Sequence, residues 1–156
     1  MKAVKHKLSA SKVSELKKEL AYLESKGRKE IEEQFDTLKN QVIEELDNPY
    51  ISISDERLFL ETRIHEIEEI LANTEILDEN ISRNADTVEI GSIVKVGFEH
   101  FEVEYTIVDP IEADPLSKKI ASDSPVGKAL IGHKLGDSVD VEVSGIKRKY
   151  WILKIK

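Results

Sequence analysis

The first half of the chain repeats apolar residues at helical intervals. Between residues 11 and 46 they recur about every three or four positions, the period that places side chains on one face of a helix. These residues are Leu16, Leu20, Leu23, Ile31, Phe35, Leu38, Val42 and Leu46. A second stripe covers residues 55–73, where Asp55 is a candidate N-cap. Pro49 lies between the stripes and disfavours a continuous helix. The pattern predicts an antiparallel two-helix coiled coil that turns near Pro49.

The period changes to two in the second half. In residues 101–108, Phe101, Val103, Tyr105 and Ile107 share one face, which predicts a strand buried on that side. Similar short runs occupy residues 92–96, 138–143 and 150–155, and a short helix fits residues 126–131. The predicted fold class is therefore α+β: a coiled-coil hairpin (1–75), a linker (76–86) and a small antiparallel β domain with one short helix (87–156).

Composition narrows the classes of function. The chain has 156 residues, a formal net charge of −8 and no cysteine. This charge argues against a general nucleic-acid binder, which needs a basic surface to displace counterions from phosphates. The missing cysteines exclude disulfides and thiolate metal sites. No secretory h-region or membrane-length apolar run is present, so we expect a cytoplasmic protein with no membrane partner.

No common catalytic or phosphate-binding motif is present, and the four histidines have no ligand spacing. The best chemical candidate is the acidic stretch at residues 44–56, which lies where the hairpin is predicted to turn. Glu44 and Asp47 are three positions apart, so on a helix they share a face. Carboxylate oxygens are ligands that Mg²⁺ prefers. The alternative is that these charges only solvate the end of the hairpin.

Four segments resemble the Gre family of bacterial transcript-cleavage factors. Residues 120–143, IASDSPVGKALIGHKLGDSVDVEV, are similar to the family's C-terminal pattern S-x-x-SP-x-(A/G)-x-AL-(I/L)-G-x-x-x-GD-x-V. TIVDPIEAD (106–114), RIHEIEEILANTEILD (63–78) and LSASKVSELKKELAYL (8–23) resemble further family segments, although Ser11 stands where glycine is usual. The resemblance covers nearly the whole chain.

The resemblance implies a fold and a function. Family members join an antiparallel coiled coil to an FKBP-like domain, bind RNA polymerase and insert the coiled coil into its secondary channel. Two carboxylates at the tip, here Glu44 and Asp47, would be the catalytic and Mg²⁺-binding residues that help the polymerase cut backtracked RNA. The chain would thus be an accessory factor and no enzyme by itself. It would act as a monomer and meet the RNA 3′ end only within the polymerase complex.

Further residues take expected roles from the resemblance. Asp123, Ser124 and Pro125 correspond to the loop that contacts the polymerase, and the same residues also suit a turn followed by an N-capped helix. Family members also carry basic residues near RNA on the coiled coil. The possible equivalents are Arg28, Lys29, Lys39 and Arg57, for which ordinary solvated helix faces are the alternative.

The tip departs from the family pattern D-L-x-E-N-A-E-Y. If one residue is missing before Tyr50, then Glu44 and Asp47 replace the essential pair at the same spacing. Without a gap, Ile43 and Leu46 occupy the two positions, and no carboxylate pair remains. Even the first alignment exchanges the side-chain lengths, and a misplacement of about 1 Å can cost about 100-fold in rate. A factor that occupies the channel and inhibits or modulates polymerase without cleavage is therefore the alternative function.

Two readings from other classes also fit parts of the sequence. An FKBP-like domain suggests a peptidyl-prolyl isomerase or chaperone, which needs an aromatic-lined pocket. The aromatic residues Phe101, Tyr105, Tyr150 and Trp151 are instead expected mostly in the core. A coiled-coil scaffold that dimerises is the other reading, and Gly27 and the Pro49 turn favour an intramolecular hairpin over it.

Overall fold

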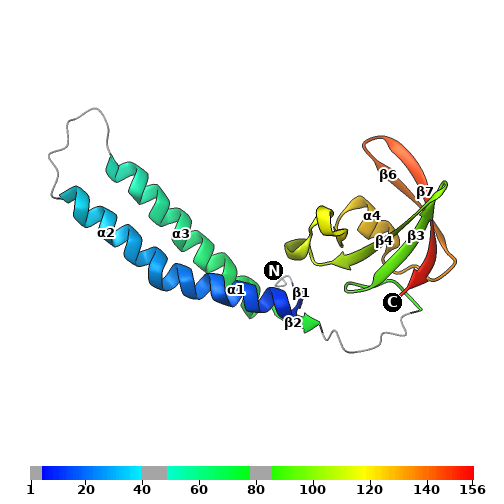
Figure 1. Ribbon diagram of the computed structural model, residues 1–156, viewed down its shortest axis with the longest axis horizontal. Coiled ribbons are helices and arrows are strands. Elements are labelled where there is room, and N and C mark those ends of the chain that lie inside the picture. The colour runs from blue at the N-terminus through cyan, green and yellow to red at the C-terminus, as the bar shows by residue number, and fades with distance from the viewer. Residues whose placement is uncertain (1–4, 40–48, 78–85) are drawn as a thin grey trace. The chain divides into compact units, whose positions relative to one another are not determined.

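The computed structural model describes residues 5–39, 49–77 and 86–156 (Figure 1). Its described residues form two compact units. The first unit comprises residues 11–74, and the second combines residues 5–10 with residues 75–156. The boundaries predicted from sequence assigned all of residues 1–75 to the N-terminal half and did not include this contribution of the N-terminal segment to the second unit.

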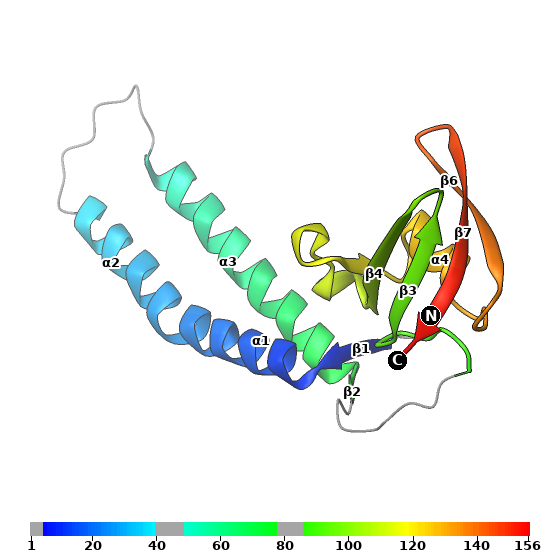
Figure 2. The same ribbon diagram turned by 45° about the vertical axis from the view of Figure 1, so that its right-hand side comes forward.

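The first unit is a helical hairpin, as predicted. Its first arm consists of α1 (Ala10–Tyr22), a π-helical turn η1 (Leu23–Gly27) and α2 (Arg28–Lys39). Its second arm, α3 (Pro49–Ala72), runs back alongside the first (Figure 2). The arms pack through a stripe of apolar side chains: Leu20, Leu23, Ile31, Phe35, Leu38, Ile53, Leu60 and Ile64. The sequence periodicity is thus the periodicity of the seam.

The start of the second arm differs from the prediction. The helix was expected to begin with Asp55 as N-cap, but α3 begins at Pro49, and Asp55 is an exposed residue within it. Proline suits the first turn of a helix because its φ is already helical and its missing N–H has no partner there. Pro49 therefore begins this helix, whereas in a helix interior it would break one.

The first arm contains an irregular turn beside a glycine. The Arg28 N–H bonds to the Leu23 carbonyl, five residues earlier, as in a π-helix. A Cβ atom on Gly27 would lie 2.7 Å from Cδ1 of Leu60 in α3. The absence of a side chain on Gly27 lets Leu60 pack against the backbone, which explains why the apolar stripe is interrupted at this position.

The second unit is built on a curled five-stranded sheet (Figure 2). Its strands are β3 (Ile93–Phe98), β4 (Phe101–Val108), β5 (Lys119–Ala121), β6 (Ser138–Val143) and β7 (Ile146–Ile155), in the order β5-β4-β3-β7-β6. All neighbours are antiparallel except β4 and β5, which are parallel. The helix α4 (Pro125–Leu130) packs on the sheet near its predicted place. The predicted sheet is confirmed for four strands, and β5 was not expected.

The core of the second unit lies between the sheet and α4. Its most buried members are Val88, Val94, Val96, Ile107, Leu130 and Ile152, with Tyr150 beside them. The prediction that Phe101 is buried was wrong: it pairs with Phe98 at the hairpin end, beyond the last core layer, and is 68% exposed. Trp151 is 46% exposed, since it follows the buried Tyr150 and points to the opposite sheet face.

Two short strands complete the fold. The strands β1 (His6–Ser9) and β2 (Thr74–Leu77) pair in a separate two-stranded sheet. Residues after Asn73 were expected to form a connection, and neither strand was predicted. Among the described helices, none has the length and apolar character needed to cross a membrane.

Candidate functional site

The predicted catalytic and metal-binding pair, Glu44 and Asp47, lies outside the described residues. The helix α2 ends at Lys39 and α3 begins at Pro49, so the segment that carries both carboxylates joins the two arms of the hairpin along the chain. Within the part of the chain that the structure describes, no group of three or more His, Cys, Asp or Glu side chains is arranged to hold a metal ion. The roles of Glu44 and Asp47 stay predictions.

Among the described residues, two ion pairs connect the arms of the hairpin. Arg28 in α2 donates from Nε and Nη2 to both carboxylate oxygens of Glu61 in α3, at 2.9 and 2.8 Å. Arg63 in α3 donates to Glu19 in α1 at 2.7 and 3.1 Å. The hydrogen bond from each arginine lowers the pKa of its carboxyl partner below the usual value. Both pairs are bidentate, the geometry in which arginine best orients a carboxylate.

The basic residues suggested for RNA contact differ in their surroundings. Arg28 is bound by Glu61. The Nζ atom of Lys29 lies 3.5 Å from Oε1 of Glu33, and the Nζ atom of Lys39 lies 2.8 Å from Oδ1 of Asp36. Arg57 lines the same shallow groove as Arg28 and forms no ion pair with another described residue. Three of the four positive charges therefore have an acidic partner within the hairpin, although the two lysine pairs are largely exposed.

The predicted polymerase-binding loop forms the start of α4. Ser124 caps this helix: its Oγ accepts a hydrogen bond from the Gly127 N–H at 3.0 Å and donates to the Ala121 carbonyl at 2.7 Å. Pro125 occupies the first helical turn. A Cβ atom on Gly127 would lie only 2.1 Å from the Ala121 carbonyl oxygen, so this turn requires glycine. The expected N-capped helix is confirmed.

The capping interaction determines which parts of this loop are accessible. Ser124 uses its hydroxyl internally, whereas Asp123 and Pro125 are exposed. The loop therefore presents one carboxylate and one rigid apolar ring on a backbone that the serine holds in place. Contact of these residues with a polymerase stays a prediction.

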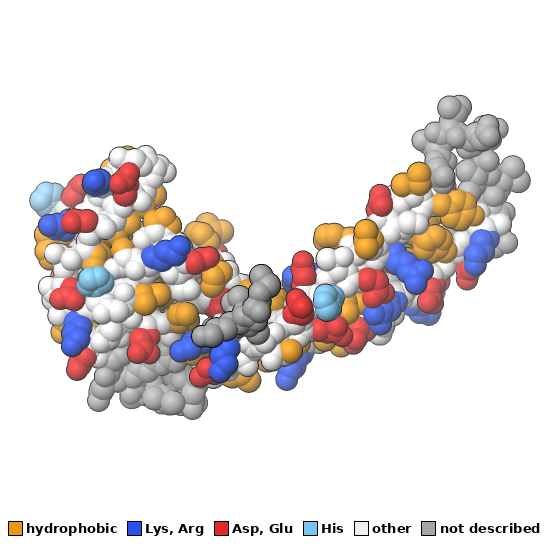
Figure 3. All heavy atoms as spheres, turned by 180° about the vertical axis from the view of Figure 1, so that it is seen from behind, with side chains coloured by type: hydrophobic (Ala, Val, Ile, Leu, Met, Phe, Trp, Pro, Cys, Tyr) orange, Lys and Arg blue, Asp and Glu red, His pale blue; other side chains and the backbone are white. Residues whose placement is uncertain are grey.

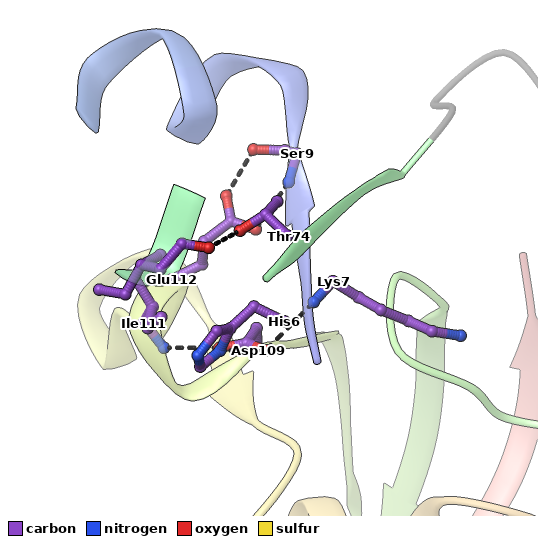
Figure 4. A network of polar contacts seen from close by, with 8 residues as sticks. His6, Lys7, Ser9, Thr74, Asp109, Ile111 and Glu112 are labelled. Atoms are coloured by element: carbon purple, nitrogen blue, oxygen red, sulfur yellow. Dashed lines mark hydrogen bonds and ion pairs between the residues drawn. The ribbon is translucent and has the colours of Figure 1, made fainter. Parts of the chain in front are cut away.

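A polar network that sequence reasoning missed joins β1 to the turn after β4 (Figure 4). Asp109 is 4% exposed, and its carboxylate accepts hydrogen bonds from the N–H groups of Lys7 and Ile111 at 3.3 and 3.2 Å. The Nδ1 atom of His6 lies 3.3 Å from both Asp109 oxygens. A buried carboxylate needs such partners, because burying an unpaired charge is costly. Asp109 therefore fixes β1 to this turn.

Glu112 extends the same network by one further residue. Its carboxylate accepts hydrogen bonds from the backbone N–H of Ser9, at 3.0 Å, and from the Ser9 hydroxyl. The segment TIVDPIEAD, which carries both acidic residues, was one of those that resemble the Gre family, but its contacts join residues about a hundred positions apart. Sequence spacing could not reveal its partners.

Comparison with known proteins decides the family. The family model described as "Transcription elongation factor, GreA/GreB, C-term" matches residues 83–156. The chain is 39% identical over 158 aligned positions to transcription elongation factor GreA of Clostridium perfringens, with 100% of this chain and 99% of that protein covered. The chain belongs to the GreA/GreB family of transcription elongation factors.

The chain is also similar to a second GreA and to one solved structure. GreA of Clostridium botulinum is 41% identical over 155 positions, covering 98% of this chain and 96% of that protein. A solved structure of the transcription factor Gfh1 is 25% identical and covers 98% of each chain, with a TM-score of 0.45. As a GreA/GreB member, the chain is an accessory transcription factor rather than an enzyme in its own right, as predicted from the resemblance.

Proposed function

We propose that this chain binds RNA polymerase, inserts its helical hairpin into the secondary channel and stimulates cleavage of backtracked RNA. The observation that carries the proposal is the pairing of family membership over the whole chain with a helical hairpin whose arms lead to and from residues 40–48. The sheet unit, for which we propose the FKBP-like fold, would contact the polymerase through Asp123 and Pro125, with Ser124 holding their loop. The factor would act in the cytoplasm as a monomer.

The tip would complete a site that the polymerase owns. Glu44 and Asp47 would hold Mg²⁺ together with polymerase groups, and two carboxylates suit this ion because it takes hard oxygen ligands. When bound, the ion supplies positive charge that activates water and stabilises the developing charge on phosphate. The chain's own contribution is to carry these carboxylates to the RNA 3′ end and to orient them.

A second candidate function is channel occupancy without cleavage, which inhibits or modulates the polymerase. The observation that favours it is the departure of the tip from the family pattern, including Pro49, at which α3 begins. Proline disfavours helical backbone angles at the residue before it, so a tip sequence that contains Pro49 would position its carboxylates differently from one that follows the family pattern. The two functions would share the same binding mode and differ in whether the tip places two carboxylates where Mg²⁺ can use them.

Transcript cleavage on backtracked elongation complexes tests the proposal. Wild type should shorten the RNA 3′ end in the presence of Mg²⁺, and Glu44→Ala and Asp47→Ala should each lose at least about 100-fold of that stimulation, as loss of well-oriented groups does. Glu45→Ala is the matched control, since it removes a neighbouring carboxylate outside the proposed pair. Binding without cleavage, together with slower elongation, would instead support the second function, and absence of polymerase binding would exclude both.

A further inference from the structure

An open apolar groove lies on the helical hairpin beside Gly27. It has a volume of about 630 Å³ and is lined by residues of both arms. Its floor is formed by Leu23, Gly27, Ile31 and Leu60, and the aromatic rings of Tyr22 and Phe59 line it from opposite arms. Phe59 is 74% exposed, a large value for a phenylalanine. Figure 3 shows hydrophobic side chains reaching the surface of the hairpin among the charged ones.

The charged side chains that line this groove are mostly acidic. Three carboxylates line it, those of Glu30, Asp55 and Glu56, and none of them forms an ion pair with another described residue. Arg63 is the one cation among the described residues that line the groove, and its guanidinium is already bound by Glu19 and Glu66. Glu30 accepts a hydrogen bond from the Tyr22 hydroxyl at 3.5 Å. The groove therefore combines an apolar floor with an excess of negative charge, which is carried by Asp55 and Glu56.

A second groove of the hairpin, on the other side of Leu60, has a balanced charge. It is lined by Arg28, Arg57, Glu32 and Glu61 around Ile31, Phe35 and Leu60, so positive and negative side chains alternate there. Arg28 and Glu61 neutralise each other across it. The two grooves therefore differ in charge: the Phe59 groove has an excess of carboxylates, whereas the Arg28 groove has two arginines and two glutamates.

Charge selects among the possible occupants of the Phe59 groove. A second copy of this chain would bring the same patch against itself in a symmetric dimer, and carboxylates would face carboxylates. RNA is disfavoured because its phosphates would meet Glu30, Asp55 and Glu56. A polypeptide with a lysine or arginine beside an apolar side chain suits both the apolar floor and the negative charge of the groove. The methylenes of the basic residue cover the floor, and its positive charge meets the carboxylates and an aromatic ring.

We infer that the Phe59 groove binds a basic, partly apolar segment of RNA polymerase. This inference rests on the proposed function, which brings the hairpin into the polymerase, and adds a contact on the side of the hairpin that does not involve residues 40–48. Phe59 and Tyr22 anchor the segment, and Glu56 and Asp55 pair with its positive charge. The groove contributes affinity and orientation to the hairpin and takes no part in the chemistry.

Equilibrium binding to core RNA polymerase from the organism that encodes the chain tests the inference. The full chain, labelled with a fluorophore in the sheet unit, is titrated with polymerase at two salt concentrations. Phe59→Ala and Glu56→Lys should each raise Kd about tenfold, the effect of losing a central interface contact. Glu56→Lys should also reduce the dependence of Kd on salt. Leu58→Ala is the matched control, because Leu58 is 68% exposed on the same helix but does not line the groove.

The outcomes separate the inference from the proposed function. If wild type binds polymerase and both Phe59→Ala and Glu56→Lys stay within about twofold of its Kd, the groove inference is wrong while the proposed function stands. If wild type does not bind, the proposed function fails and the named partner fails with it. A concentration-dependent dimer in sedimentation that Phe59→Ala abolishes would assign the groove to a second copy instead. Unchanged thermal melting of each variant shows that the fold is intact.

Discussion

The helical hairpin is only two helices thick, whereas the sheet unit encloses a cluster of side chains that water does not reach. In the hairpin seam beyond Leu16 and Ile67, which are 1% and 0% exposed, the buried side chains retain 3–8% exposure. In the sheet unit, by contrast, a cluster of five core residues is fully buried: Val88, Val94, Val96, Ile107 and Leu130. A close-packed interior cannot take up an extra atom without strain, but a thin seam has flexible side chains that turn outward. The two units should therefore respond differently to the same substitution.

Two glycines provide the sharpest test of this difference. Gly127→Ala places a methyl group against the Ala121 carbonyl oxygen, which the backbone holds, and should destabilise the sheet unit by about 3 kcal/mol. Gly27→Ala meets only the mobile end of Leu60 and gains helix propensity, so the hairpin should change by less than about 1 kcal/mol. Hydrogen exchange followed by mass spectrometry reports the stability of each unit separately.

Lys128→Ala is the control for the first substitution, because Lys128 is an exposed neighbour in the same helix. It should change stability by less than about 0.5 kcal/mol. If Gly127→Ala and Gly27→Ala lowered the free energy of unfolding equally, the two units would tolerate an added methyl group alike, and the proposed difference in their packing would be wrong.

The buried network of the sheet unit gives the next effect in size. Asp109→Ala leaves the N–H groups of Lys7 and Ile111 without their acceptor and should cost about 2 kcal/mol. Asp109→Asn keeps one acceptor oxygen in place and should cost about 1 kcal/mol. The increase in hydrogen exchange should appear in peptides covering residues 5–10 and 109–112. Unchanged protection there would mean that β1 is held by other contacts.

The smallest effect is expected in the hairpin, at the ion pair of Glu19 and Arg63. Both side chains are partly exposed, so a double-mutant cycle should give a coupling of about 0.5 kcal/mol that falls with added salt. The Arg63 hydrogen bond lowers the pKa of Glu19, so this coupling is fully present above the unfolded carboxyl pKa. It is lost as the pH falls through the folded value. A coupling that is larger at acidic pH would contradict this sign.

The fold was predictable where its contacts are local and periodic. The heptad-like stripe through Leu20, Ile31 and Leu38 gave the hairpin, and the alternation in residues 138–143 gave a strand. The strand β5 has only three residues, too few to show an alternating pattern, and its partner β4 lies earlier in the sequence behind an intervening loop. No periodicity in the sequence therefore reveals it. The start of α3 was misplaced because a proline can either interrupt a helix or occupy its first turn, and sequence does not distinguish these roles at Pro49.

The candidate site was predictable only in part, because sequence patterns report contacts between near neighbours and not contacts between distant segments. The Ser124 cap follows from residues within three positions of each other, and it was expected. The role of Gly27 depends on Leu60 in the other arm, and that of Asp109 depends on His6 and Lys7 in the N-terminal strand. Interactions over such separations leave no local pattern. The Phe59 groove likewise appears only when both arms are assembled.

The attachment of β1 to residues 109–112 also sets an order of events during synthesis. Residues 6–9 leave the ribosome about a hundred residues before Asp109 and Glu112, the side chains that receive their hydrogen bonds. Closing so long a loop is entropically costly, and the hydrogen bonds that offset this cost form only when the sheet unit has folded. The hairpin helices, which make local contacts, can form first. A fragment that begins at residue 75 would therefore carry Asp109 without the strand that normally satisfies it, and would not be equivalent to the sheet unit of the full chain.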